Sequence, residues 1–122
     1  MAQAALHSMH QPEDVVCARI QLKPGSLPRV QEWAEHMRAH RDEALQTLAA
    51  EGVTVESVFL DSGAGGDFLV YCMRSTSQEA AQAVAARSVA AIDAYHRAFK
   101  RETWAEVRKL DLLLDLSRAP TE

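Results

Sequence analysis

The stretch ESVFLDSGAGGDFLVYCM, residues 56–73, decides the fold. With Val53 just before it, it contains two apolar segments, 53–61 and 67–74, on either side of the turn sequence SGAGG. Apolar segments of this length, rich in Val, Phe, Leu and Tyr and separated by glycines, are typical of a β-hairpin. A phosphate-binding loop would need a helix after the glycines, and a strand follows here instead. We therefore place an antiparallel hairpin at the centre of the chain.

The elements around this hairpin follow from periodicity and helix-capping signals. Residues 14–23 alternate as a strand, and Pro24-Gly25 ends it. Residues 27–51 carry an apolar stripe at spacings of three and four and stop at Gly52. Helical patterns follow over 78–87 and 89–107, and 110–116 is predicted as the last strand. The order predicts an α+β fold of the ferredoxin-like βαββαβ type, with a four-stranded antiparallel sheet and helices on one face.

Length and composition indicate one globular domain. The chain has 122 residues, of which 48% are hydrophobic and 25% charged, with a net charge of −4. We expect a domain over 14–117 with flexible tails at 1–13 and 118–122. The acidic balance and the lack of a basic stripe argue against nucleic acid as a partner. Acidic residues surround Arg97, Lys100 and Arg101, so we interpret these three as a solvated helix face. No apolar run approaches the length of a membrane span, so we expect no membrane partner.

The cysteines and the amino terminus suggest a location. The first residues show no basic segment followed by an apolar one, so we expect no secretory signal and a cytoplasmic protein. In that reducing compartment Cys17 and Cys72 are predicted to be buried thiols. Their spacing matches no zinc or redox motif.

The hairpin strands are apolar on both faces, which predicts a partner. Val55 and Phe59 point one way while Val58 and Leu60 point the other. The chain's own helices can cover one face only, and an uncovered face is normally polar. We expect a homodimer with the open faces packed together. The alternative is an apolar patch tolerated on a monomer.

Four segments resemble a family of small bacterial proteins. They are ARIQLKPG (18–25), HRDEALQTLAAEGV (40–53), the hairpin, and IDAYHRAFKRETW (92–104). The family is known as a domain of unknown function and is similar to the dimeric α/β-barrel superfamily. That superfamily includes cofactor-independent monooxygenases, sugar mutarotases and haem-handling enzymes. The resemblance implies the fold and a dimer, whereas it brings no reaction and no site residues.

His40 and Arg41 interrupt the apolar stripe of the first predicted helix. A polar break in a core pattern costs stability unless the groups find partners. The functional interpretation turns both side chains into a cavity between helix and sheet, where His40 is catalytic and Arg41 holds a ligand. The structural alternative is an Arg41 that extends into solvent or pairs with Glu56.

Glu56 is the most unusual polar residue on a predicted strand, because apolar residues flank it on both sides. A carboxylate in that position is either paired with Arg19 or Arg41, or has a raised pKa suited to proton transfer. We name Glu56 as a candidate catalytic residue and leave the pairing alternative open.

The segment 92–104 supplies further candidates. His96 lies on the same side of its helix as Ile92 and Phe99, so it should face the sheet and act as a general base. Tyr95 and Tyr71 are expected on the walls of the same cavity as ligand-binding residues. The alternative is that Tyr95 fills the core and His96 belongs to a hydrogen-bond network.

We expect neither a metal nor a bound cofactor. Glu32, His36 and His40 lie four residues apart and could share a helix face, yet two histidines at this spacing also occur by chance. No HExxH sequence, nucleotide fingerprint, P-loop or Ser-His-Asp order is present.

These observations leave three functions open. The first is a small-molecule enzyme that uses acid–base chemistry without a tightly bound cofactor, such as an isomerase, mutarotase or monooxygenase. The second is a non-catalytic ligand-binding or regulatory module with the same pocket. The third is a structural dimer whose polar residues form ion pairs only.

Overall fold

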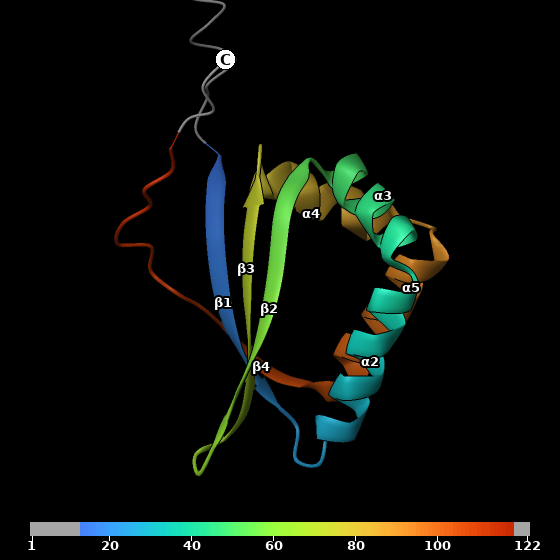
Figure 1. Ribbon diagram of the computed structural model, residues 1–122, viewed down its shortest axis with the longest axis vertical. Coiled ribbons are helices and arrows are strands. Elements are labelled where there is room, and N and C mark those ends of the chain that lie inside the picture. Colours follow the sequence, from blue (N-terminus) through green and yellow to red (C-terminus); the bar gives the residue numbers. More distant parts are fainter. Residues whose placement is uncertain (1–12, 119–122) are drawn as a thin grey trace, which may run out of the picture.

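A computed structural model describes residues 13–118, so most of the two expected tails lies outside the described residues. Figure 1 shows two layers, a sheet and a row of helices. In chain order the elements are β1 (Asp14–Leu22), α2 (Leu27–Ala39), α3 (Arg41–Glu51), β2 (Val53–Gly63), β3 (Gly66–Ser75), α4 (Gln78–Arg87), α5 (Ala91–Thr103) and β4 (Trp104–Lys109).

The four strands form one antiparallel sheet in the order β2-β3-β1-β4, and all the helices lie against one of its faces (Figure 1). The α+β class and the four-stranded antiparallel sheet are as the sequence predicted. The ferredoxin-like βαββαβ assignment, and with it the dimeric α/β-barrel class, is wrong. The β1–β2 and β3–β4 connections each hold two helices, so the order is β-α-α-β-β-α-α-β.

The first connection is two helices because the chain breaks at His40. His40 has φ −111° and ψ 36°, outside helical geometry, and its backbone N–H donates to the His36 carbonyl. Its ring Nδ1 lies 2.9 Å from the same carbonyl oxygen. The side chain therefore helps to end α2, while α3 begins at the next residue. The polar interruption of the apolar stripe marks a joint between helices, where the sequence predicted one helix over 27–51.

The second connection is also divided, with Ser88, Val89 and Ala90 between its helices. Ser77 caps α4 by accepting a hydrogen bond from the Ala80 backbone N–H. The Arg97 guanidinium of α5 donates to the carbonyl oxygens of Ala85 and Ser88, both at 3.2 Å. Arg97 thus satisfies carbonyl groups at the end of α4 that the helix leaves free.

The last strand lies earlier in the chain than predicted. β4 spans Trp104–Lys109 and pairs with β1, whereas the predicted strand over 110–116 has no regular secondary structure. The predicted helix over 89–107 accordingly ends at Thr103. The leucines of 110–116 suggested a strand, but their side chains are largely in solvent: Leu113 is 94% exposed. Trp104 and Val107 instead face the helices and line a cavity there.

The hairpin register fixes which side chains face the helices. Tyr71 pairs with Val58 on one side and with Ala18 on the other. Glu56 pairs with Met73, and this pair lies two residues along each strand from the Val58–Tyr71 pair. Because side chains alternate between faces, Glu56 and Tyr71 share the face that the helices cover.

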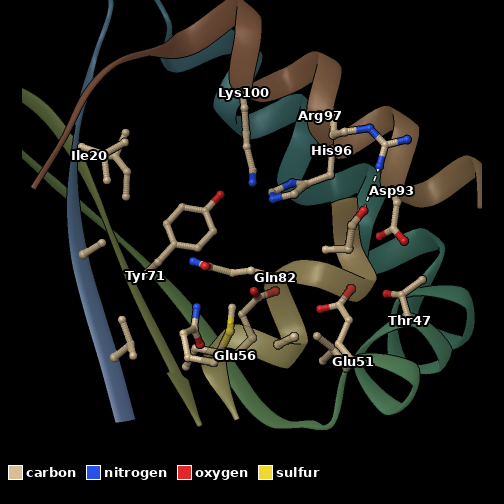
Figure 2. Close-up of a pocket in the computed structure, with 18 of the residues that line it drawn as sticks. Ile20, Thr47, Glu51, Glu56, Tyr71, Gln82, Asp93, His96, Arg97 and Lys100 are labelled. Carbon is tan, nitrogen blue, oxygen red and sulfur yellow. Dashed lines mark hydrogen bonds between the residues drawn. The ribbon is translucent and has the colours of Figure 1, made fainter. Parts of the chain in front are cut away.

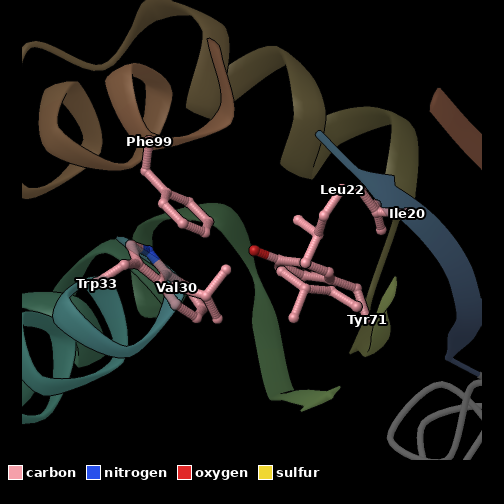
Figure 3. Packing of buried hydrophobic residues seen from close by; sticks show 7 residues of the cluster. Ile20, Leu22, Val30, Trp33, Tyr71 and Phe99 are labelled. Atoms are coloured by element: carbon pink, nitrogen blue, oxygen red, sulfur yellow. The ribbon is translucent and has the colours of Figure 1, made fainter. Parts of the chain in front are cut away.

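The core lies between β1, β3 and the helices α2 and α5 (Figure 3). Phe99 is fully buried and stacks on Trp33, with ring centroids 4.6 Å apart. Ile20 and Leu69 are also buried and close the sheet side of the cluster. This packing fixes α5 against the sheet, and so sets the direction of the α5 side chains beside Phe99.

A disulfide joins Cys17 to Cys72, so the prediction of reduced thiols is wrong. The two residues are directly paired on adjacent strands, and their Cα atoms are 4.2 Å apart. Spacing along the sequence could not reveal the pair, because 55 positions separate the two residues. Only the register of β1 against β3 brings them together.

The opposite face of the sheet carries no helix (Figure 1). Phe59 and Val55 lie on this face and are 59% and 49% exposed. Arg19 also lies there, packing over the Phe68 ring and pairing with Asp61. No helix within residues 13–118 is long and apolar enough to cross a membrane.

Candidate functional site

A cavity of about 390 Å³ lies between the inner face of the sheet and the helices. Its floor is formed by inward-facing residues of β1, β2 and β3, and its walls by α3, α4 and α5 (Figure 2). The volume is in the range of small-molecule sites. Apolar side chains such as Val16, Ile20 and Met37 make up part of the lining, and several polar and charged groups point inward.

Tyr71 presents its hydroxyl to this cavity (Figure 2). The residue is 8% exposed, and its hydroxyl has no hydrogen-bond partner in the described part of the chain. Burial raises the pKa of Tyr71 above its ordinary value, and the charge of Glu56 raises it further. The phenol is therefore protonated at neutral pH. Since an unpartnered buried polar group is costly, a cavity occupant that accepts from this hydroxyl would relieve the cost.

His96 is held in one tautomer. The Trp33 Nε1–H donates to His96 Nδ1 at 3.0 Å, and an indole nitrogen can only donate. His96 Nδ1 must therefore be the acceptor, which leaves the proton of the neutral ring on Nε2. Burial, together with the smaller effect of the Lys100 charge, lowers the pKa of His96 from 6.5 to about 3. At neutral pH His96 is a hydrogen-bond donor through Nε2–H, and it lacks the free lone pair of a general base.

Three carboxyl groups border the same space. Glu56 comes from β2, Glu51 from the end of α3 and Asp93 from α5 (Figure 2). Burial raises the pKa of Glu51 to about 7, with the charges of Asp93 and Glu56 adding to the effect. Burial also raises the pKa of Glu56, although its side chain stays accessible to water through the cavity. Carboxyl groups with raised pKa values can take up and release protons near neutral pH.

Lys100 enters the cavity from α5 (Figure 2). Its Nζ lies 4.9 Å from the centre of the Trp104 ring. Burial lowers the pKa of Lys100, while the charges of Glu56 and Glu51 act in the opposite direction. None of the ion pairs found among residues 13–118 involves Lys100 or Glu56.

The structure brings three of the six predicted site residues together: Glu56, Tyr71 and His96 line the cavity. The alternative that Glu56 pairs with Arg19 is wrong, because Arg19 lies on the opposite face and pairs with Asp61. The expected placement of His40, Arg41 and Tyr95 on the cavity is also wrong.

None of these three residues lines the cavity: Tyr95 packs against the core cluster, and His40 is half-buried. Arg41 is exposed at the start of α3. His36 stacks between His40 and Tyr95, with centroid distances of 4.1 and 3.6 Å. The Tyr95 hydroxyl accepts a hydrogen bond from Arg29 at 2.9 Å. The described residues contain no group of three or more metal-ligating side chains close enough to hold a metal ion.

The charged stripe of α5 was not predicted from the sequence. Asp93, His96, Arg97 and Lys100 recur at spacings of three, one and three, and all four line the cavity. Basic residues of this segment looked like a solvated helix face because acidic residues surround them in the sequence. Their spacing relative to His96 could have predicted this placement, because positions i, i+3, i+4 and i+7 share one helix face.

A second cavity, of about 340 Å³, adjoins the first between α3, α4 and the start of α5. The two cavities share Thr47, Glu51 and Asp93. Two of these three residues carry carboxyl groups, so the wall that the cavities share is acidic and favours neutral or cationic ligands over anions.

These features define the chain as an α+β protein with a polar, small-molecule-sized cavity between its sheet and its helices. Residues 13–121 match a family whose description is "Family of unknown function (DUF6176)", and the chain belongs to that family. The predicted resemblance to a family of unknown function is thereby confirmed. A comparison with curated proteins finds none that matches.

Proposed function

We propose that the protein is an enzyme that moves a proton on a small neutral carbonyl compound, without a tightly bound cofactor. One observation carries the proposal: two protonated donors, Tyr71 and His96, share a cavity with the carboxyl group of Glu56, whose pKa is raised. A donor pair opposite a carboxylate of raised pKa is what enolisation next to a carbonyl requires. An isomerase or mutarotase acting on a hydroxy-aldehyde, hydroxy-ketone or sugar fits these groups.

The donors would hold the substrate oxygen. Tyr71 Oη and His96 Nε2–H point into the same part of the cavity (Figure 2). Both are neutral donors at pH 7, so they can strengthen their hydrogen bonds as negative charge develops on the carbonyl oxygen. The Trp33 indole positions His96 from behind and keeps its proton on the cavity side. This assigns His96 the role of oxygen-binding donor in place of the general base that the sequence suggested.

Glu56 would carry the proton. Burial raises the pKa of its carboxyl group, and Glu56 has no ion-pair partner among residues 13–118, so no neighbouring cation lowers its basicity by pairing with it. It takes a proton from the carbon next to the carbonyl and returns it to the neighbouring atom of the enediol. Gln82 also reaches the cavity and offers a neutral partner for a substrate hydroxyl (Figure 2).

Glu56→Gln is expected to lower the catalysed rate about 10²- to 10⁴-fold, because it removes the proton carrier and keeps the shape. The measurement is deuterium incorporation from D₂O into dihydroxyacetone and glyceraldehyde, followed by proton NMR. Glu79→Gln, an exposed change on α4 away from the cavity, is the matched control and should keep the wild-type rate. Binding without exchange in the wild type would support the ligand-binding module and reject the enzyme.

A homodimer through the open sheet face is part of the proposal. The support is the exposure of Phe59 and Val55 on that face and of Leu113 and Leu116 in the segment after β4. Apolar surface of this extent on an antiparallel sheet favours a partner, and a second copy offers a matching surface.

Light scattering at micromolar concentration should give twice the chain mass for the wild type. Phe59→Lys should give the monomer mass, because it places a charge in the interface. Leu45→Lys, on an exposed position of α3, should leave the mass at the dimer value. A wild-type monomer under these conditions would reject the dimer.

The remaining expectations stay predictions. They are the absence of nucleic-acid and membrane partners, a bacterial origin, and a cytoplasmic location. The Cys17–Cys72 disulfide weighs against the last, because disulfides persist mainly in oxidising compartments. The proposed chemistry depends on none of them.

A further inference from the structure

Lys100 is a cavity group to which the proposed acid–base chemistry gives no role. It projects from α5 into the part of the cavity where the Tyr71 hydroxyl and the His96 ring also point (Figure 2). Phe99, the residue before it, is fully buried against Trp33, so this turn of α5 is held firmly in place. The Lys100 side chain lies along the Trp104 ring, which limits the directions that its amine can take.

We propose that Lys100 is a nucleophile that forms an imine with the carbonyl carbon of the substrate, which makes the substrate class aldehydes and ketones. The inference rests on the proposed function and adds a covalent step to it. Its geometric basis is an amine without an ion-pair partner among residues 13–118, in a cavity that also holds two oxygen-binding donors and a carboxyl group.

The step balances without any further reactant. The Lys100 amine nitrogen forms a bond to the carbonyl carbon, and one amine proton passes to the oxygen to give a carbinolamine. The carbon–oxygen bond then breaks, and the oxygen leaves as water with a proton supplied by the Glu56 carboxyl. The product is an iminium ion, which makes the neighbouring carbon–hydrogen bond more acidic. The Glu56 carboxylate, now deprotonated, takes that proton.

Burial supports the assignment, because it lowers the pKa of Lys100 and so increases the fraction of free amine at neutral pH. The groups around the amine explain why the pKa of Lys100 is lowered although carboxyl groups lie nearby. The pKa of Glu51 is raised to about 7, so part of its negative charge is absent at neutral pH, and burial shifts the pKa of Glu56 in the same direction. Arg97 faces the same stripe and opposes protonation of the amine.

The structural alternative is a lysine that stays charged and packs on Trp104. A cation above an indole ring is a recognised stabilising contact. The two interpretations differ in one respect that can be measured. An imine needs a nucleophilic nitrogen, whereas packing on Trp104 needs only a cation. Lys100→Arg separates them, because a guanidinium keeps the charge and stacks well but does not form an imine.

The test is reductive trapping with glyceraldehyde and sodium cyanoborohydride at neutral pH, with the site read by peptide mass mapping. The chain has three lysines, Lys23, Lys100 and Lys109, so each is easily resolved. Lys109 lines the cavity at an exposed position of β4 and serves as an internal comparison. We expect Lys100 to be modified at least about tenfold faster than either of the others, as a lowered pKa and a bound carbonyl require.

Three variants complete the experiment. Lys100→Met and Lys100→Arg should both lose the adduct at position 100 and the exchange of deuterium into dihydroxyacetone. Lys23→Met should retain both, because the Lys23 amine donates to the Arg101 carbonyl away from the cavity. If Lys100→Met does not fold, Lys100→Arg still decides the question. Glu56→Gln should still form the adduct, although more slowly, and lose the exchange.

The outcomes separate the two proposals. Modification that is equal at the three lysines, or exchange that persists in Lys100→Arg, would overturn the imine and leave the proposed function standing. Failure of the wild type to exchange deuterium would overturn the proposed function. Selective trapping at Lys100 in that case would still identify the nucleophile.

Discussion

Reduction of the Cys17–Cys72 disulfide is expected to lower the free energy of unfolding by about 2–4 kcal/mol. The bond joins positions 55 residues apart, so in the unfolded chain it closes a long loop and removes conformational entropy. For a domain of this size the loss corresponds to a fall in Tm of roughly 10 °C or more. Thermal unfolding followed by circular dichroism, with and without a strong reductant, measures the difference.

The double variant Cys17→Ala, Cys72→Ala gives the same comparison without the reductant. It should unfold at the temperature of the reduced wild type and should not respond to reductant. The disulfide lies on the open face, one register step from the Ala18–Tyr71 pair on the cavity side. Loss of the bond is therefore expected to affect stability first. A wild-type Tm that does not change on complete reduction would show that the bond contributes nothing to the fold.

Acid is expected to destabilise the protein through His96. The folded state lowers the pKa of His96 from 6.5 to about 3, whereas the unfolded chain keeps the ordinary value. Between these two values the unfolded state binds more protons, so stability is lost as the pH falls from 6.5 toward 3. From pH 7 to pH 4 this single group accounts for a loss of about 3 kcal/mol.

His96→Asn isolates the contribution, because its amide oxygen can still accept from the Trp33 indole and the side chain does not titrate. The comparison is needed because Glu51 and Glu56 act in the opposite sense. Their raised pKa values favour the folded state as the pH falls. Urea unfolding at pH 7 and pH 4 should show a smaller acid loss in the variant than in the wild type.

His36→Asn is the matched control for acid sensitivity. Burial also lowers the pKa of His36, but this ring lies outside the cavity, stacked against Tyr95. We expect its replacement to change the acid dependence less than that of His96. Equal acid losses in wild type and His96→Asn would contradict the neutral, Nε2-protonated form of His96 on which its assigned role depends.

The parts of the fold that follow from local patterns could be predicted from the sequence. The two apolar segments and the glycines between them predicted the hairpin, and β2 and β3 pair as that prediction requires. The phase of His96 relative to Ile92 and Phe99 likewise predicted that it faces the sheet, and it lines the cavity. Each of these predictions depended only on a pattern of neighbouring residues along the chain.

The errors arose where a local pattern had two physical explanations. The polar break at His40 fitted both a buried site and a helix joint, and only the backbone geometry decides between them. The leucines of 110–116 fitted a strand, but a strand needs a partner, and β4 already occupies the edge beside β1. Cys17 and Cys72 were assigned as thiols from the expected compartment, a property that does not determine which residues the sheet register brings together.

Lys100 illustrates what sequence alone leaves out. Beside Arg97 and Arg101 it looked like part of a solvated basic face. In the structure Arg97 donates hydrogen bonds to backbone carbonyl oxygens at the end of α4, and Arg101 is exposed. Lys100 is left facing the cavity, and this distinction depends on the packing of α5 against the sheet.

The most direct test of the central claim is to locate a bound carbonyl compound in solution. Proton–nitrogen NMR spectra of the labelled wild-type protein, titrated with dihydroxyacetone, report every backbone amide and the indole and imidazole groups. The account predicts shifts at Glu56, Tyr71, His96 and Lys100, and at the Trp33 indole that bonds His96. Shifts confined to Phe59 and its neighbours on the open face, or no saturable shift in the cavity, would contradict it.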